Sequence, residues 1–231
     1  MKYLPDIRKS PSPNFNERRE GRSPTILVMH YTGMPTAAAA LDRLRAPDAE
    51  VSAHYLVEED GTIHLMVNEE KRAWHAGVGK WRGVSDINSA SIGIEIVNPG
   101  HEFGYQPFPE LQMKSVVWLS REIVGRHDIK PFNVIGHSDI APERKTDPGE
   151  LFDWKMLAEN TIGMWPSDTS IFEEDDFFEN LQVIGYEVCD RELVTKAFQR
   201  HWRQHEISGI ADTETKKIAA VLRKQVEHLT K

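Results

Sequence analysis

The sequence predicts an α/β fold with a mixed central sheet flanked by helices, followed by a small three-helix domain. Two short runs of apolar, largely β-branched residues, 25–30 and 91–97, are typical of buried strands. A longer segment, 109–127, repeats apolar residues at helical spacing and predicts a helix. The composition changes near residue 163, and three further helical segments follow without an intervening strand.

The N-terminal segment, residues 1–24, is polar and contains four prolines. We expect an extended arm that either lies on the following domain or is mobile. It lacks the apolar stretch of a secretory signal, so we expect a cytoplasmic protein. The alternative is a periplasmic protein whose export segment is missing from this chain.

The α/β domain is predicted to begin with the buried strand 25–30. Residues 36–45 are rich in Ala and place Leu41 and Leu44 three apart, which predicts a helix ended by Pro47. The sequence Asp60-Gly61 is typical of the turn of a β-hairpin between strands at 54–57 and 62–67.

A long loop, rich in Gly and polar residues, is expected over 74–88, before the strand 91–97. The remaining elements expected in this domain are the helix 109–127, a brief strand at 133–135 and a helix at 151–161.

We therefore expect the α/β domain over residues 25–162, a linker over 163–172 and a helical domain over 173–231. Within the helical domain, Asp212 is a candidate N-cap of the last helix. Its three helices are predicted at 173–184, 190–205 and 212–230.

Charge and composition exclude several classes of protein. A net charge of −8 and a pI near 5.7 do not fit a nucleic-acid-binding protein, which carries a basic surface. No stretch approaches the ~20 apolar residues of a membrane span. The single cysteine, Cys189, excludes an intramolecular disulfide. Nothing in the sequence indicates an oligomeric state.

Three residues from distant segments form a candidate zinc site. His30 ends the strand 25–30, and His137 follows the strand 133–135. Asp147 precedes Pro148-Gly149, which would hold it on a turn, although it could equally serve as a turn former or helix cap. Three protein ligands leave a fourth zinc position open for water, whereas a structural site normally has four, usually rich in Cys.

A zinc hydrolase also requires a proton acceptor beside the metal. Glu95 lies within the apolar strand 91–97, where a charge is costly unless it is paired or functional. Alternation places it on the face opposite Ile92, Ile94 and Ile96, so we expect it to face a cleft. Lys145 lies two residues before Asp147, a spacing that puts both on one side of an extended segment. It is a candidate to stabilise a developing negative charge.

The sequence around these residues resembles the zinc-dependent N-acetylmuramoyl-L-alanine amidases, whose fold is shared with T7-type lysozyme and the peptidoglycan recognition proteins. The matching strings run through most of residues 12–160: 12–15 (SPNF), 28–32 (VMHYT), 52–57 (SAHYLV), 60–63 (DGTI), 74–77 (WHAG), 91–95 (SIGIE), 136–140 (GHSDI) and 144–149 (RKTDPG). The resemblance implies zinc on His30, His137 and Asp147, with Glu95 as the catalytic base and Lys145 as the charge stabiliser.

The C-terminal segment resembles a peptidoglycan-binding module of three helices. The matching strings are 181–186 (LQVIGY), 197–200 (AFQR) and 209–215 (GIADTET), whereas 203–208 departs from the usual short turn. The combination of amidase and module favours the AmiD-like over the AmpD-like branch. It implies that the partner is peptidoglycan or a muropeptide, with normal or 1,6-anhydro muramic acid.

Two other functions remain open: recognition of cell-wall fragments without catalysis, and a zinc peptidase acting on wall peptides. Retention of all five site residues favours the amidase. We expect Trp74, His75 and Asn98 to contact substrate, and His54 to pack or hydrogen-bond beneath the site. The remaining histidines have no context that distinguishes them from surface residues: His64, His101, His127, His201, His205 and His228.

Overall fold

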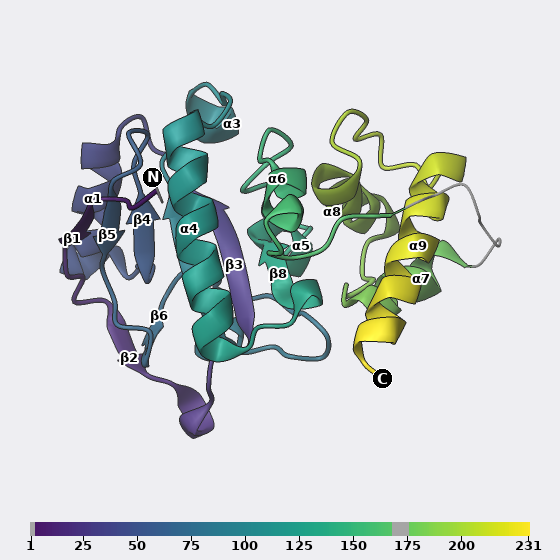
Figure 1. Cartoon of the computed structure of the whole chain (residues 1–231), viewed down its shortest axis with the longest axis horizontal. Helices are drawn as coiled ribbons and strands as arrows, with labels where there is room; N and C mark the ends of the chain where they lie inside the picture. Colours follow the sequence, from purple (N-terminus) through teal and green to yellow (C-terminus); the bar gives the residue numbers. More distant parts are fainter. Residues whose placement is uncertain (1–2, 168–175) are drawn as a thin grey trace.

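The computed structural model describes residues 3–167 and 176–231. Figure 1 shows two parts side by side: a sheet crossed by the long helix α4 (Glu110–His127), and a group of three helices that ends at the C-terminus. The three helices are α7 (Phe177–Ile184), α8 (Arg191–Trp202) and α9 (Thr213–Leu229). The predicted order of an α/β part and a helical part is therefore confirmed.

Six strands form the central sheet in the order β1-β5-β4-β7-β3-β8. The pair β4–β5 is antiparallel and the other neighbours are parallel, so the sheet is mixed, as predicted. A second sheet pairs β2 with β6. The strands are β1 (Ile7–Lys9), β2 (Phe15–Glu17), β3 (Ile26–Tyr31), β4 (Tyr55–Val57), β5 (Ile63–Leu65), β6 (Lys71–Ala73), β7 (Ser91–Ile96) and β8 (Val134–Gly136).

Polar side chains cap most of the longer helices. Thr36 accepts a hydrogen bond from the backbone of α1, and Asp212 caps α9 as predicted. None of the helices in the described residues is long and apolar enough to cross a bilayer. The other helices are α1 (Ala37–Arg45), α2 (Ile87–Ala90), α3 (Gly100–Phe103), α5 (His137–Ile140) and α6 (Trp154–Glu159).

One face of the sheet forms the apolar core beneath α4. Ile92, Ile94 and Ile96 of β7 are fully buried there against residues of α4 that include Val116 and Ile123. The predicted alternation along this strand is therefore confirmed, and the apolar positions of α4 follow from its helical spacing.

The opposite face of the sheet leaves space for polar side chains. His30, near the end of β3, pairs in register with Glu95 on β7, so both side chains share this face. Gly93 lies two residues before Glu95, and a Cβ there would come within 2.5 Å of the His75 ring. The glycine thus provides the room that His75 occupies beside His30.

The N-terminal segment is part of the folded structure from Tyr3 onward. β1 adds a parallel strand next to β5, and β2 pairs with β6. Arg18 is buried and donates hydrogen bonds to the backbone carbonyls of four residues: Glu69, Asn88, Ser89 and Ser91. Burial, with a smaller effect of Arg72, lowers its pKa to about 10, so the guanidinium stays protonated at neutral pH.

Several expected boundaries differ from those of the structure. The strand expected at 133–135 lies one residue later, and the helix expected at 151–161 is confined to α6. The three-residue strands β1, β2 and β6 and the short helices α2, α3 and α5 were not predicted. Segments this short carry no measurable periodicity, and they depend on partners far away in the sequence.

The helical part shares an apolar core with the sheet-bearing part. Phe198 and Leu222 belong to the same buried cluster as Trp81, Phe132 and Ile140. The first helix of the group begins at Phe177, with Asp176 as its N-cap. Of the expected linker, residues 163–167 are described, and Trp165 packs against both apolar clusters. Its remaining residues and the expected helix start at 173–175 lie outside the described residues.

Replacing Arg18 by Met should destabilise the fold strongly. The substitution keeps the length of the buried stem but leaves backbone carbonyls of four residues without their donor. We expect a loss on the order of 3 kcal/mol in the free energy of unfolding, measured by chemical denaturation. The neighbouring Arg19 has a side chain 69% exposed, so Arg19→Met is the control and should stay within about 0.5 kcal/mol of the wild type. Equal losses in both variants would contradict the assigned role of Arg18.

Candidate active site

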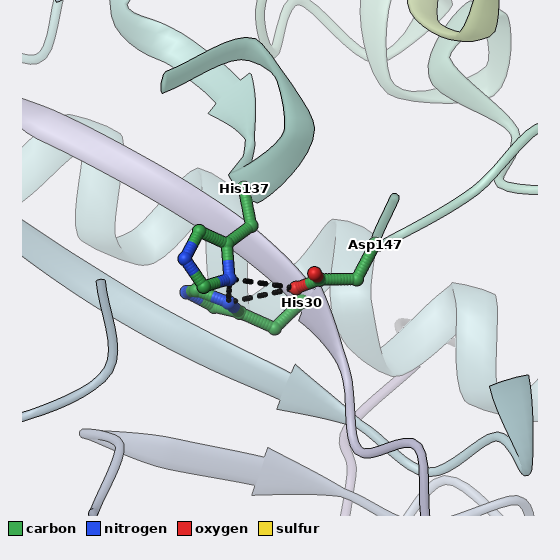
Figure 2. Close-up of side chains that lie close together, drawn as sticks. All are labelled: His30, His137 and Asp147. Atoms are coloured by element: carbon green, nitrogen blue, oxygen red, sulfur yellow. Dashed lines mark hydrogen bonds and ion pairs between the residues drawn. The ribbon is translucent and has the colours of Figure 1, made fainter. Parts of the chain in front are cut away.

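Three buried side chains from distant segments meet at one point (Figure 2). His30 comes from β3, His137 begins α5, and Asp147 lies in the loop that follows. The Nδ1 atoms of the two histidines are 3.0 Å apart, and each is 3.0 Å from Oδ2 of Asp147. The structure thus brings together the three residues that the sequence predicted as metal ligands.

The outward nitrogen of His137 fixes the position of its proton. Nε2 lies 3.0 Å from the carbonyl oxygen of Ala76, which can only accept a hydrogen bond. Nε2 therefore carries the proton, and Nδ1 presents a lone pair toward His30 and Asp147. The carbonyl of Ala76 is held in turn by Arg144, whose Nη2 lies 2.8 Å away.

A chain of hydrogen bonds fixes the proton of His30 in the same way. The hydroxyl of Ser91 donates to the carbonyl of Ile87 at 2.6 Å, so its oxygen accepts from Nε2 of His75 at 3.1 Å. Nδ1 of His75 must then accept from Nε2 of His30, 3.0 Å away. Nδ1 of His30 is left with a lone pair that points at the common centre.

The three converging atoms are therefore all electron-pair donors. Burial, followed by the proximity of His137, lowers the pKa of His30 to about 4, so this imidazole is neutral near pH 7. Two imidazole nitrogens and a carboxylate oxygen form a ligand set that fits a divalent cation such as zinc.

Glu95 lies beside this cluster, with its side chain partly open to a cleft. Burial raises the pKa of its carboxyl well above the ordinary value; Asp147 raises it further, whereas Lys145 lowers it. Within residues 3–167 and 176–231, its Oε2 atom finds no hydrogen-bond partner. A carboxylate with one oxygen buried and without a partner is suited to take up a proton.

The cleft has a volume of about 430 Å³ and contains the predicted catalytic groups. Glu95, His137 and Asp147 line it together with Lys145, which is half-exposed. Trp74 also lines the cleft, and its indole nitrogen donates to Oδ1 of Asn16 at 3.1 Å.

Of the two other predicted substrate contacts, His75 reaches the cleft and Asn98 does not. His75 lines the cleft but is largely buried, and its ring nitrogens contact His30 and Ser91. Asn98 is 1% exposed, and its side chain bonds to the backbone of Gln106 and Gly100. Asn98 therefore holds a loop, and the cleft-lining residues of the described chain do not include it.

Other polar residues have roles that the sequence analysis did not assign. His54 accepts from the backbone of Gly93 beneath the site, as expected. His201 and His64 were expected at the surface, but both are buried, with Asp139 and Glu58 respectively as partners. Asp139 lies in the quoted string 136–140, yet the side chains that bond to it, Tyr186 and His201, come from the other end of the chain.

Comparison with known proteins places the chain among amidases. The profile of the N-acetylmuramoyl-L-alanine amidase family matches residues 20–150. AmiD of Escherichia coli K12, an N-acetylmuramoyl-L-alanine amidase, is 36% identical over 229 residues, which cover 85% of this chain and 81% of that protein. The 1,6-anhydro-N-acetylmuramyl-L-alanine amidase AmpD of Enterobacter cloacae is 37% identical over 172 residues, covering 67% of this chain and 90% of that protein.

Solved structures agree with the sequence relatives. The complex of E. coli AmiD with anhydro-N-acetylmuramic acid-L-Ala-D-gamma-Glu-L-Lys has a TM-score of 0.78 at 35% identity and covers 91% of this chain and 98% of that chain. AMPDH3 of Pseudomonas aeruginosa, in complex with anhydromuramic pentapeptide, has a TM-score of 0.81 at 32% identity, with coverages of 90% and 94%. The family match, the sequence relatives and the solved structures all indicate the same family. The chain belongs to the N-acetylmuramoyl-L-alanine amidase family.

Proposed function

We propose that this chain hydrolyses the amide bond between N-acetylmuramic acid, including its 1,6-anhydro form, and L-alanine, with zinc held by His30, His137 and Asp147. The observation that carries the proposal is the convergence of three ligand atoms without protons beside Glu95, in a cleft of an amidase fold. The anhydro form is supported by the relatives: AmpD is named for it, and AmiD and AMPDH3 were solved with anhydromuramic ligands.

Three ligands from this chain would leave part of the coordination sphere of zinc open to the cleft. Two histidine nitrogens and one carboxylate oxygen resemble the ligand sets of catalytic zinc sites. A zinc ion there supplies Lewis acidity, which polarises an amide carbonyl and lowers the pKa of water. The hydrogen bonds to Ala76 and His75 orient the two imidazoles and keep their lone pairs directed at the ion.

We assign Glu95 as the general base. Its register with His30 puts its carboxylate on the same face of the sheet as the metal ligands. Glu95 would accept a proton from the water that attacks the amide carbon, and then deliver it to the departing nitrogen of L-alanine. A base with a pKa near the working pH is efficient in both steps, which agrees with the direction of its shift.

Lys145 is proposed to balance the charge that develops during the attack. Its position at the cleft brings its charge close enough to lower the pKa values of both Glu95 and His30. A fixed cation there would stabilise the negative oxygen of the tetrahedral intermediate more than the neutral amide. Trp74, at the rim of the same cleft, offers an aromatic surface on which a sugar ring could stack.

Removal of metal should abolish turnover. After dialysis against a strong zinc chelator, the protein should no longer release L-Ala peptides from anhydro-muropeptides. Addition of one equivalent of zinc should restore this release, which is measured by mass spectrometry. His137→Ala should bind well under one zinc per chain, because one of three ligands is lost. The exposed His205 provides the control, and His205→Ala should bind zinc as the wild type does. Full activity of a metal-free preparation would end the proposal.

Glu95→Gln tests the base separately from the metal. The amide keeps the shape of the side chain but accepts no proton, so kcat should fall by roughly 10²–10⁴-fold. Zinc content, measured by elemental analysis, should stay at the wild-type level. Glu122→Gln on the exposed side of α4 serves as the control. Near-normal turnover in Glu95→Gln would assign the base to another residue.

Lys145→Met tests the charge-stabilising role. The side chain keeps a similar length without its charge, so kcat should drop about 10²-fold while KM changes little. Lys145→Arg should recover part of the loss, because it restores the charge. Should Lys145→Met instead raise KM alone, the lysine would bind the substrate rather than stabilise the reaction.

A further inference from the structure

A buried carboxylate joins the helical part of the chain to the turn that carries His137. Asp139 is 1% exposed and lies on α5, two residues after His137. Its Oδ2 accepts from the backbone nitrogen of Gly136 at 2.7 Å and from Nδ1 of His201 at 2.7 Å. Its Oδ1 accepts from the hydroxyl of Tyr186 at 2.7 Å. Two of these three donors come from the helical part.

Both donors from the helical part are themselves held in place. The ring of His201 stacks on Trp154 at a centroid distance of 3.8 Å and on Trp202 at 3.7 Å. The hydroxyl of Tyr186 accepts from the indole nitrogen of Trp202 at 3.0 Å. The donors therefore meet the carboxylate already oriented, and little conformational freedom is lost when the bonds form.

The turn that Asp139 stabilises positions two metal ligands. Its carboxylate bonds to the backbone of Gly136, directly before His137, and so closes the start of α5. Ser138, which lies between His137 and Asp139, donates its backbone N–H to the carbonyl of Asp147 at 2.9 Å. A shift of this turn would therefore move His137 and the Asp147 loop together.

We propose that the helical domain supports the catalytic centre, with Tyr186 and His201 as positioning residues that act through Asp139 on the turn bearing His137. This inference rests on the proposed metal site. Partners that orient metal ligands affect metal affinity and activity as well as folding, because ligands must be held in the binding geometry before the ion arrives.

Two substitutions at His201 separate the hydrogen bond from the packing. His201→Phe keeps a flat ring between its aromatic neighbours but removes the donor to Asp139. His201→Asn loses the stacking but places an N–H close to the position of Nδ1. Tyr186→Phe, which removes a single oxygen, is the third variant and is useful if His201→Phe folds poorly.

The control removes a comparable network inside the helical domain. Gln199 is fully buried, and within residues 3–167 and 176–231 its side chain bonds to residues of this domain, among them Gly209, Ile210 and Thr215. Gln199→Leu should lower the melting temperature without reaching Asp139. Each protein is prepared metal-free, and its affinity for zinc is measured by competition with a chromogenic chelator, together with its melting temperature and its kcat and KM on an anhydro-muropeptide.

We expect His201→Phe and Tyr186→Phe to bind zinc roughly tenfold more weakly than the wild type, with lower kcat. His201→Asn should bind zinc more tightly than His201→Phe, and Gln199→Leu should match the wild type. If His201→Phe and Tyr186→Phe lost melting temperature but bound zinc like Gln199→Leu, the domain would be only structural and the inference overturned. If the wild type itself bound no zinc, the proposed function would fall, and this inference with it.

Discussion

The site depends on the convergence of three buried atoms that have electron pairs but no protons to share. Two imidazole nitrogens and a carboxylate oxygen lie 3.0 Å from one another. Such an arrangement is unfavourable in isolation, because lone pairs face one another in a poorly solvated space. The surrounding structure enforces it by engaging the outward nitrogens, through the carbonyl of Ala76 and through His75 and Ser91. A cation is the partner that satisfies all three atoms together.

This constraint explains why polar residues are so common on one face of an otherwise apolar sheet. The side chains of His54 and Arg18 bond to backbone groups and to each other. The ring of His75 bonds to His30 and Ser91. Gly93 makes space for the His75 ring. The opposite face, against α4, is built mainly from Ile, Leu and Val and forms an apolar core. One face of the sheet therefore packs in the apolar core, and the other carries the polar residues of the site.

The sequence alone predicted the elements with a strong local signal. β3 begins with a run of four apolar residues, β7 places Ile at every second position, and α4 has a clear helical period. The metal ligands could be found because two of them end strands and the strings around them resemble a known family. Asn98 shows the limit of such reasoning, since it was expected to contact substrate whereas its amide holds a loop. The roles of Asp139 and His201 could not be predicted, because they exist only where two distant segments meet.

The buried carboxylate of Asp139 also bears on how such a chain can change over evolutionary time. In a protein without α7–α9, the carboxylate of Asp139 would lose its donors Tyr186 and His201. The apolar surface around Trp81 and Ile140 would also be exposed to solvent. Loss or exchange of the C-terminal helices therefore demands compensating replacements in the other half of the molecule. A chain with the amidase part alone would therefore be expected to carry another residue at the position of Asp139, or other donors to its carboxylate.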